Sequence, residues 1–176
     1  MSQGDDGAGA QHPLLTPEAL RAIYAQAARE RPAECCGIVF GARGQAVADR
    51  VHPCQNTQDQ KHAEDASGNP RDAHTAYALG TRDLLLLSKS LRGAEPAKII
   101  YHSHVDRPGD GAYFSQMDQS IAQFEGEPCY GGVEYVVVDI KDDGPHGAAQ
   151  FAWSAEAKRF VEVLRYDVTG AVTRSA

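Results

Sequence analysis

Two histidines close together, followed after a loop by an aspartate, are the residues in this sequence best suited to chemistry. His102 and His104 flank Ser103 at the end of the short apolar run 97–100. Residues two apart on a β-strand point to the same face, so both imidazoles would project together from the end of one strand. Asp118 follows where the pattern predicts the first turn of a helix. Two histidines and one carboxylate are the ligands of a catalytic zinc that keeps its fourth position for water.

Each part of this pattern has a simpler explanation when it is taken alone. Two histidines on a strand often lie on a solvated face. Ser115 and Asp118 have the spacing of a capping box, which stabilises the start of a helix. The combination favours a metal site, because His-x-His ends a strand, a loop rich in glycine and proline follows, and the next helix opens with Ser-x-x-Asp. Ser115 can cap that helix while Asp118 turns toward the metal.

A hydrolytic metal site also needs a general base, and Glu34 is the candidate. It stands at the edge of the apolar segment 35–40, where a charged residue is expected only if it is exposed or paired. Taken by itself, Glu34 fits better a charge at a strand edge that faces water.

The composition limits the partners of such a site. The 176 residues suit one domain, and 42% of them are hydrophobic, enough for a core. The net charge of -7 argues against nucleic acid or an anionic membrane as the main partner. No apolar run is long enough to span a bilayer, and the acidic N-terminus lacks the apolar region of a signal peptide. Because Cys35 and Cys36 are adjacent, reduced thiols of a cytoplasmic protein are expected rather than a disulfide framework.

The periodicity of the chain predicts a single mixed α/β domain. We expect a disordered tail over residues 1–11, the domain over 12–166 and a C-terminal tail over 167–176. Helices are expected after the caps Thr16, Thr81 and Ser115. A mobile loop is expected over 55–71, and 155–164 fits either a helix or a strand. The predicted strands cover 35–41, 46–52, 73–78, 97–104, 133–140 and 148–153.

Taken together, the motifs resemble those of the JAMM (MPN+) metalloprotease family. That family has a glutamate near its first strand, then His-Ser/Thr-His, then Ser-x-x-Asp, as in residues 32–39, 102–104 and 115–118 here. The resemblance covers Leu15 to about Trp153. It is closest to the prokaryotic branch, which includes peptidases acting on sulfur-carrier proteins and in which the residues before Ser-x-x-Asp tend to read as 112–114 do. The resemblance implies a mixed β-sheet flanked by helices, with the cytidine-deaminase-like architecture of JAMM/MPN domains.

The resemblance also implies a role for each residue of the motif. His102, His104 and Asp118 would bind one zinc ion per chain. Glu34 would act as general base and then as general acid, and Ser115 would donate to the oxyanion. Ser103, on the opposite face of its strand, is expected to pack or to form a hydrogen bond.

The substrate implied is the C-terminal Gly-Gly tail of a ubiquitin-like or sulfur-carrier protein. The sequence leaves these two open. Tyr113 and Phe114 could pack against that tail. Ten residues, 105–114, separate His104 from Ser115, where the family usually has seven. Because loops accept insertions at small cost, we expect the ligands to be kept and the choice of partner to be affected.

Other classes of function fit the sequence less well. A catalytically silent MPN scaffold that binds a partner protein would usually have lost ligands, and this chain keeps all of them. A zinc deaminase would need His-x-Glu and Pro-Cys-x-x-Cys, but the segment that starts at Pro128 lacks the second cysteine. Cys129 could be a nucleophile, but no base is placed beside it in the sequence, and a structural cysteine fits better.

Overall fold

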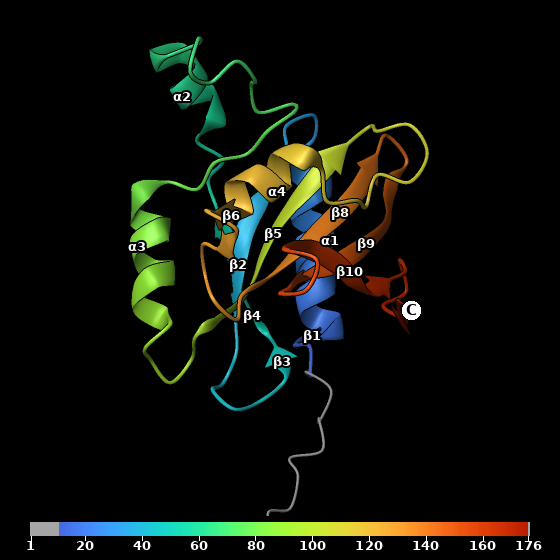
Figure 1. Cartoon of the computed structure of the whole chain (residues 1–176). Helices are drawn as coiled ribbons and strands as arrows, with labels where there is room; N and C mark the ends of the chain where they lie inside the picture. Colours follow the sequence, from blue (N-terminus) through green and yellow to red (C-terminus); the bar gives the residue numbers. More distant parts are fainter. Residues whose placement is uncertain (1–10, 176) are drawn as a thin grey trace, which may run out of the picture.

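The computed structural model describes residues 11–175, so all but one residue of the expected disordered tail, 1–11, lies outside the described part (Figure 1). A seven-stranded sheet forms the centre of the domain, in the order β11-β10-β9-β8-β5-β2-β4. Within it β5 and β8 run parallel and the other neighbours run antiparallel, so the mixed α/β fold is confirmed. Its strands are β2 (Cys36–Phe40), β4 (Arg50–Cys54), β5 (Ala97–Val105), β8 (Glu134–Lys141), β9 (Gly144–Ser154), β10 (Arg159–Tyr166) and β11 (Val172–Arg174).

Four helices and two small strand pairs complete the described chain. Short strands β1 (Leu14–Leu15) and β3 (Val47–Ala48) pair in parallel, and β6 (Gln123–Phe124) pairs with β7 (Glu127–Pro128). The helices are α1 (Pro17–Glu30), α2 (Gln58–Glu64), α3 (Thr81–Ser90) and α4 (Gln116–Ala122). None of these helices has the length and hydropathy that crossing a bilayer requires.

The two faces of the sheet are covered by different helices (Figure 1). Helix α1 buries Leu20 and Ile23 against one face, which includes Ile99 and Tyr101 of β5. Helices α3 and α4 cover the other face, to which Ile100 of β5 belongs. Side chains alternate along a strand, so the histidines of β5 lie on the same face as Ile100, beneath α4. The sheet thereby sets the position of both imidazoles.

The start of α1 follows the sequence pattern. Thr16 is the N-cap, its Oγ1 accepts the Ala19 N–H at 3.2 Å, and Pro17 takes the first helical position. In the third helix the cap is Gly80 rather than Thr81, which becomes the first helical residue.

Three segments differ from the sequence-based expectation. The segment 73–78 forms no strand, because the Asn56 side chain binds the Ala76 carbonyl and the Ala78 N–H, which takes up groups that a ladder would use. The expected loop 55–71 contains α2, a polar helix without an apolar periodicity to reveal it. The expected C-terminal tail 167–176 contains β11, which pairs with β10.

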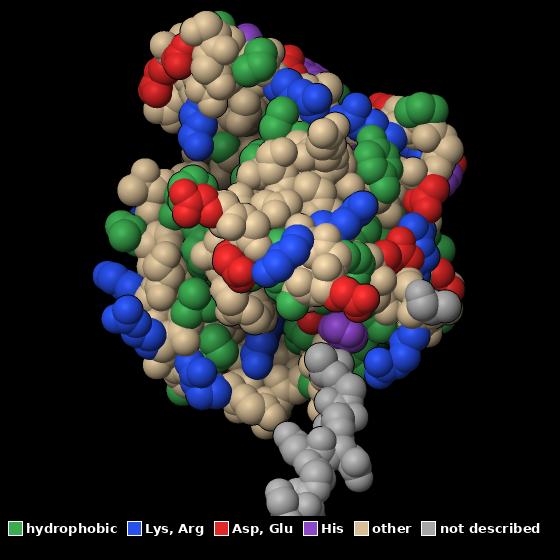
Figure 2. All heavy atoms as spheres, viewed as in Figure 1, with side chains coloured by type: hydrophobic (Ala, Val, Ile, Leu, Met, Phe, Trp, Pro, Cys, Tyr) green, Lys and Arg blue, Asp and Glu red, His purple; other side chains and the backbone are tan. Residues whose placement is uncertain are grey.

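Acidic and basic side chains are interspersed over the face of the molecule shown in Figure 2, with small apolar groups between them. The larger exposed apolar side chains include Met117 and Ile121 of α4, which stand beside the pocket described next.

Candidate metal centre

The two histidines of β5 project together, as the period of a strand requires. The His102 side chain is fully buried and the His104 side chain is nearly so. Their Nε2 atoms are 3.3 Å apart. Strands β2 and β8 pair with β5 on either side, so the backbone beneath the histidines is hydrogen-bonded to two neighbouring strands.

Asp118 is brought to the histidines by the start of α4. Ser115 is the N-cap of this helix, and a full capping box forms. The Ser115 hydroxyl accepts the Asp118 N–H at 3.1 Å, and the Asp118 carboxylate accepts the Ser115 N–H at 2.7 Å. The capping box therefore does not exclude a metal site, because the same carboxylate also faces both imidazoles.

The spacing of the three side chains suits a tetrahedral metal ion. Asp118 Oδ1 is 3.3 Å from His102 Nε2, and Asp118 Oδ2 is 3.5 Å from His104 Nε2. Ligands bound to zinc at the usual distances and tetrahedral angles are separated from one another by about 3.3 Å. The donor atoms thus already stand at the separations that the ion requires, and all three side chains are buried.

The protonation of the group agrees with this assignment of donor atoms. His104 Nδ1 is 2.9 Å from the Gly111 carbonyl, which can only accept, so Nδ1 carries the proton and Nε2 keeps its lone pair. Burial opposes the charge on His102, but the Asp118 carboxylate outweighs it and raises the pKa of His102. Burial lowers the pKa of His104. Burial also disfavours ionised Asp118. The charge of His102 and the hydrogen bonds that Asp118 accepts nevertheless hold the pKa of Asp118 far below the usual range. A cation in this place would replace a proton shared by the group.

A second layer of contacts fixes His104, and it includes a residue that the sequence analysis missed. Buried Asp139 of β8 accepts the Gly111 N–H at 3.0 Å, and this places the Gly111 carbonyl on His104. A side chain at Gly111 would collide with the Asp139 carboxylate, so the close approach requires glycine here. The signal for Asp139 was present in the sequence, because it is an acid that directly follows the apolar run 135–138 and precedes Ile140.

Glu34 is buried beside this group, not exposed at a strand edge. Its side chain is only 2% exposed, and its backbone N–H donates to the Ala73 carbonyl at 2.7 Å. Burial raises the pKa of Glu34 to about 7, although the charges of His102 and Arg107 work in the opposite direction. A carboxyl with a pKa near neutrality can both take up and release a proton at physiological pH, as a general base must.

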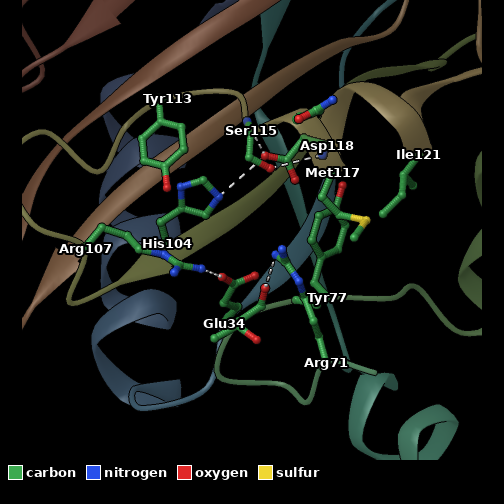
Figure 3. Close-up of a pocket in the computed structure, with 13 residues that line it drawn as sticks. Glu34, Arg71, Tyr77, His104, Arg107, Tyr113, Ser115, Met117, Asp118 and Ile121 are labelled. Carbon is green, nitrogen blue, oxygen red and sulfur yellow. Dashed lines mark hydrogen bonds and ion pairs between the residues drawn. The ribbon is translucent and has the colours of Figure 1, made fainter. Parts of the chain in front are cut away.

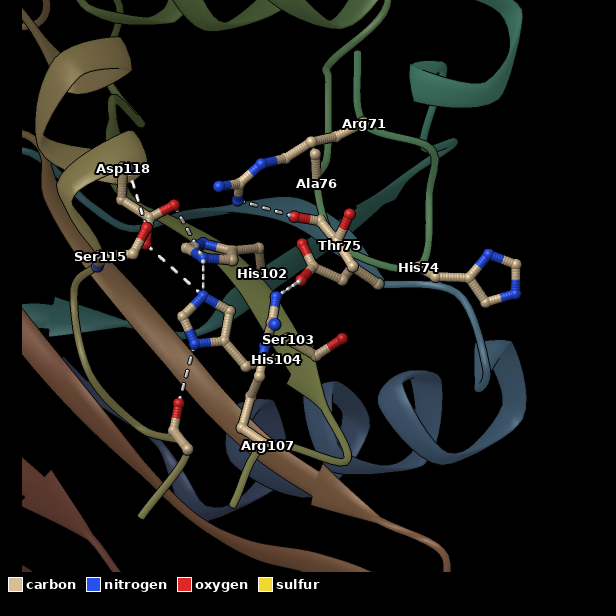
Figure 4. Close-up of polar contacts among 12 residues, drawn as sticks. Arg71, His74, Thr75, Ala76, His102, Ser103, His104, Arg107, Ser115 and Asp118 are labelled. Carbon is tan, nitrogen blue, oxygen red and sulfur yellow. Dashed lines mark hydrogen bonds and ion pairs between the residues drawn. The ribbon is translucent and has the colours of Figure 1, made fainter. Parts of the chain in front are cut away.

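A cavity of about 200 Å³ connects these groups to solvent (Figure 3). Glu34, His104, Ser115 and Asp118 line it, so four of the five expected catalytic and ligand residues share one opening. His102 lies beneath, where the Tyr77 ring stacks on its imidazole at 4.3 Å between centroids. Figure 4 shows the contacts that join the two histidines to Asp118.

The remaining expected residues divide between pocket and core. Tyr113 lines the pocket, with its ring 4.7 Å from the His104 ring, and is 42% exposed. Phe114 is absent from that lining and packs among core aromatic rings, including Phe151 at 5.2 Å, so only Tyr113 is kept as a candidate for substrate contact. Ser103 accepts the Cys35 N–H at 2.8 Å, which confirms its hydrogen-bonding role. Cys129, whose thiol lies 3.5 Å from the Ile121 carbonyl, is not among the residues that line this pocket.

Two arginines of the pocket were not expected from the sequence. Arg107 comes from the enlarged loop 105–114, and its Nη2 lies 3.5 Å from Glu34 Oε1. Arg71 reaches the cavity from the segment between α2 and α3. Nothing in the spacing of arginines along the chain indicates these positions, because both lie in irregular segments.

Comparison with known proteins links the chain to one family. Residues 16–155 match a family described as prokaryotic homologs of the JAB domain. CysO-cysteine peptidases from Mycobacterium tuberculosis and Mycobacterium bovis are 28% identical over 134 residues, which cover 76% of this chain and 77% of theirs.

Two solved structures share the fold. A solution structure of a protein from Desulfitobacterium hafniense superposes with a TM-score of 0.54 at 19% identity, over 92% of this chain and 88% of that one. A solution structure from Salinibacter ruber gives the same TM-score, 0.54, at 22% identity, over 85% of this chain and 87% of its own. At these sequence identities the two structures show a shared fold and nothing about function.

Proposed function

We propose that this chain, which belongs to the family of prokaryotic homologs of the JAB domain, is a zinc-dependent peptidase that cuts after the C-terminal Gly-Gly of a small carrier protein. The family match and the similarity to CysO-cysteine peptidases support a JAB-type peptidase. The substrate class, the identity of the metal and the role of each residue are our proposal. As in the mycobacterial relatives named for it, we propose a CysO-like carrier linked to cysteine as the substrate.

One observation carries the proposal. Three buried side chains bring the two histidine Nε2 atoms and the two Asp118 carboxylate oxygens into contacts of 3.3–3.5 Å, the spacing of zinc ligands. A buried carboxyl with a pKa of about 7, that of Glu34, lines the same cavity. A site that served only stability would gain nothing from burying Glu34, because burial of a carboxyl costs free energy unless it is fully paired. Burial that is not compensated fits a base held ready for a proton.

Zinc held by His102, His104 and Asp118 would supply Lewis-acid chemistry, lowering the pKa of a water to about 7 and polarising the scissile carbonyl. Glu34 takes the proton of the attacking water onto a carboxylate oxygen. It then returns that proton to the leaving amine as the bond between the glycine carbonyl carbon and the amine nitrogen breaks. The water oxygen ends in the new carboxylate of the carrier, so one water is consumed for each bond cut.

Ser115 stabilises the charge that develops on the carbonyl oxygen. Its oxygen already accepts the Asp118 N–H, so the hydroxyl proton is free to be donated into the cavity. A hydroxyl fixed by a helix cap is preorganised, and donors of this kind contribute most when they need no rearrangement. Capping and catalysis thus use different atoms of one side chain.

The shape of the opening supports a substrate tail made of glycine. Tyr113 packs on His104 at one side, and Met117 and Ile121 form an apolar rim at another. A cavity of about 200 Å³ can take an extended backbone without side chains, and the rim suits an apolar residue earlier in the tail. We place this reaction in the cytoplasm, where thiols are reduced, because the four cysteines are free.

The test is hydrolysis of a carrier–cysteine adduct by the purified protein, followed by intact mass. Zinc-loaded protein should release cysteine and leave a carrier that ends in Gly-Gly. Treatment with EDTA should stop the reaction, and added zinc should restore it. Release that continues at the same rate after complete metal removal, verified by elemental analysis, would contradict the proposal.

A further inference from the structure

We infer that Arg107 and Arg71 form a subsite that binds the free α-carboxylate of the leaving amino acid. The inference rests on the proposed function and specifies the leaving group of that reaction. The leaving group would be a C-terminal amino acid and not the side chain of a lysine. It begins with the two guanidinium groups that face the cavity on either side of Glu34 (Figure 3).

Both arginines have hydrogen-bonding capacity that the described residues leave unused. Arg107 has a single 3.5 Å contact with Glu34, and its buried Nε has no partner within residues 11–175. Among the residues that the structure describes, the Arg71 side chain makes one hydrogen bond, which it donates to the Thr75 carbonyl at 3.5 Å. Arg31, in contrast, binds Asp106 through two nitrogens, at 3.3 and 2.8 Å. A guanidinium has five N–H donors, so the pocket pair can still take up a carboxylate.

The position relative to Glu34 decides which carboxylate this can be. Glu34 returns the proton to the leaving amine, so the amine must come within hydrogen-bond distance of the Glu34 carboxyl. Arg107 contacts that same carboxyl. In a C-terminal amino acid, the α-carboxylate is attached to the carbon that carries the amine. A group bonded so close to the amine falls within reach of a guanidinium that already touches the base.

The charges change in a way that suits this role. When Glu34 accepts a proton it becomes neutral, and Arg107 loses its negative partner. The Arg107 side chain is 27% exposed, so water replaces the negative charge of Glu34 only in part. A leaving-group carboxylate would compensate it at the moment when the bond breaks. An amine on a lysine side chain brings no negative charge there, so an isopeptide would leave the arginines unpaired.

The position of Arg107 also suggests a function for the enlarged loop 105–114. The loop 105–114 is held by the Arg31–Asp106 pair at one end and by the pair of Asp110 with Arg165, at 2.7 Å, near its other end. Between these anchors it directs Arg107 inward (Figure 4). The loop would thus select the leaving group rather than the surface of the carrier.

The experiment compares three substrates with the same Gly-Gly tail. One ends in cysteine with a free carboxylate, one ends in cysteine amide, and one joins glycine to the side chain of a blocked lysine. Zinc-loaded protein should give a kcat/KM about 10²-fold higher for the free acid than for either of the others, the scale of charge-assisted hydrogen bonds. Arg107→Ala should bring the ratio of acid to amide close to one, and Arg71→Ala should lower it in part. Arg82→Ala, which removes an exposed arginine of α3, should leave the ratio unchanged.

A binding measurement separates this inference from the proposed function. In EDTA-treated protein the acid should bind at least about tenfold more tightly than the amide, and Arg107→Ala should abolish the difference. If the protein binds the acid more tightly than the amide but the zinc-loaded protein cleaves neither, the proposed peptidase activity is refuted and the carboxylate subsite is supported. Equal binding and equal cleavage of acid and amide would overturn the subsite alone. An Arg107→Ala variant that slows both substrates by the same factor would do so as well, because Arg107 would then act only as the counter-ion of Glu34.

Discussion

Replacing Glu34 with glutamine should stabilise the metal-free protein at alkaline pH, although it removes the proposed general base. Burial raises the pKa of this carboxyl from 4.5 to about 7. The folded protein therefore binds more protons than the unfolded chain between these values, and its stability falls as the pH rises through them. Glutamine has the same shape and no charge to desolvate, so the variant does not incur this loss.

The magnitude follows from the difference in pKa. A tenfold change in proton affinity is about 1.4 kcal/mol, so the ionised Glu34 destabilises the fold by about 3 kcal/mol above pH 7. In a chain of this size such a difference corresponds to a melting temperature higher by about 10 °C in the variant. At pH 4.5 or below, where the carboxyl is protonated, the two proteins should be equally stable.

Urea unfolding of EDTA-treated protein at several pH values between 4 and 8.5 measures this difference. Glu162→Gln is the matched control with the opposite sign. Burial works against ionised Glu162, but its bonds from Arg165 and Ser175 outweigh this and lower its pKa. Its charge therefore stabilises the fold above the unfolded pKa, and glutamine there should lose stability at pH 8. A Glu34→Gln difference that does not change with pH would refute the claim that burial disfavours the ionised base.

Three further predictions concern the metal and the oxyanion. His104→Ala and Asp118→Ala should lower the zinc content from about one per chain to near zero by elemental analysis, because a site of this kind needs all its protein ligands; full zinc in both would refute the assignment. Ser115→Ala should lower kcat by about 10²–10³-fold and stability by about 1 kcal/mol, whereas Ser120→Ala in the same helix, whose hydroxyl donates to the Gln116 carbonyl, should leave kcat unchanged. Asp139→Ala should weaken zinc binding by about 10–100-fold in a competition titration, because Gly111 would no longer hold His104; unchanged affinity would show that this layer is dispensable.

The local part of the site could be predicted from the sequence. The period of a strand places His102 and His104 on one face, and the Ser-x-x-Asp spacing gives both the helix cap and the orientation of Asp118. These features depend on residues that are near one another in the chain. Short-range geometry is therefore sufficient to derive them.

The long-range part could not be derived in this way. Glu34 lies beside His102 because Cys36 of β2 stands opposite His102 of β5, and strand register across 66 positions is set by packing of the whole sheet. The resemblance to a family supplied Glu34, while its own neighbours suggested an exposed charge. Arg71 and Arg107 come from irregular segments, whose paths depend on single contacts such as those of Asn56 and Asp106. No periodicity records such contacts.

The most direct test of the account is to measure zinc content and turnover together in Glu34→Gln. The variant should bind as much zinc as the natural sequence, because Glu34 is not proposed as a ligand, and it should cleave a Gly-Gly-linked cysteine adduct about 10²–10⁴-fold more slowly. Loss of zinc in the variant would make Glu34 part of the metal site. Cleavage at the rate of the natural sequence, with zinc in place, would contradict the central claim that Glu34 moves the proton.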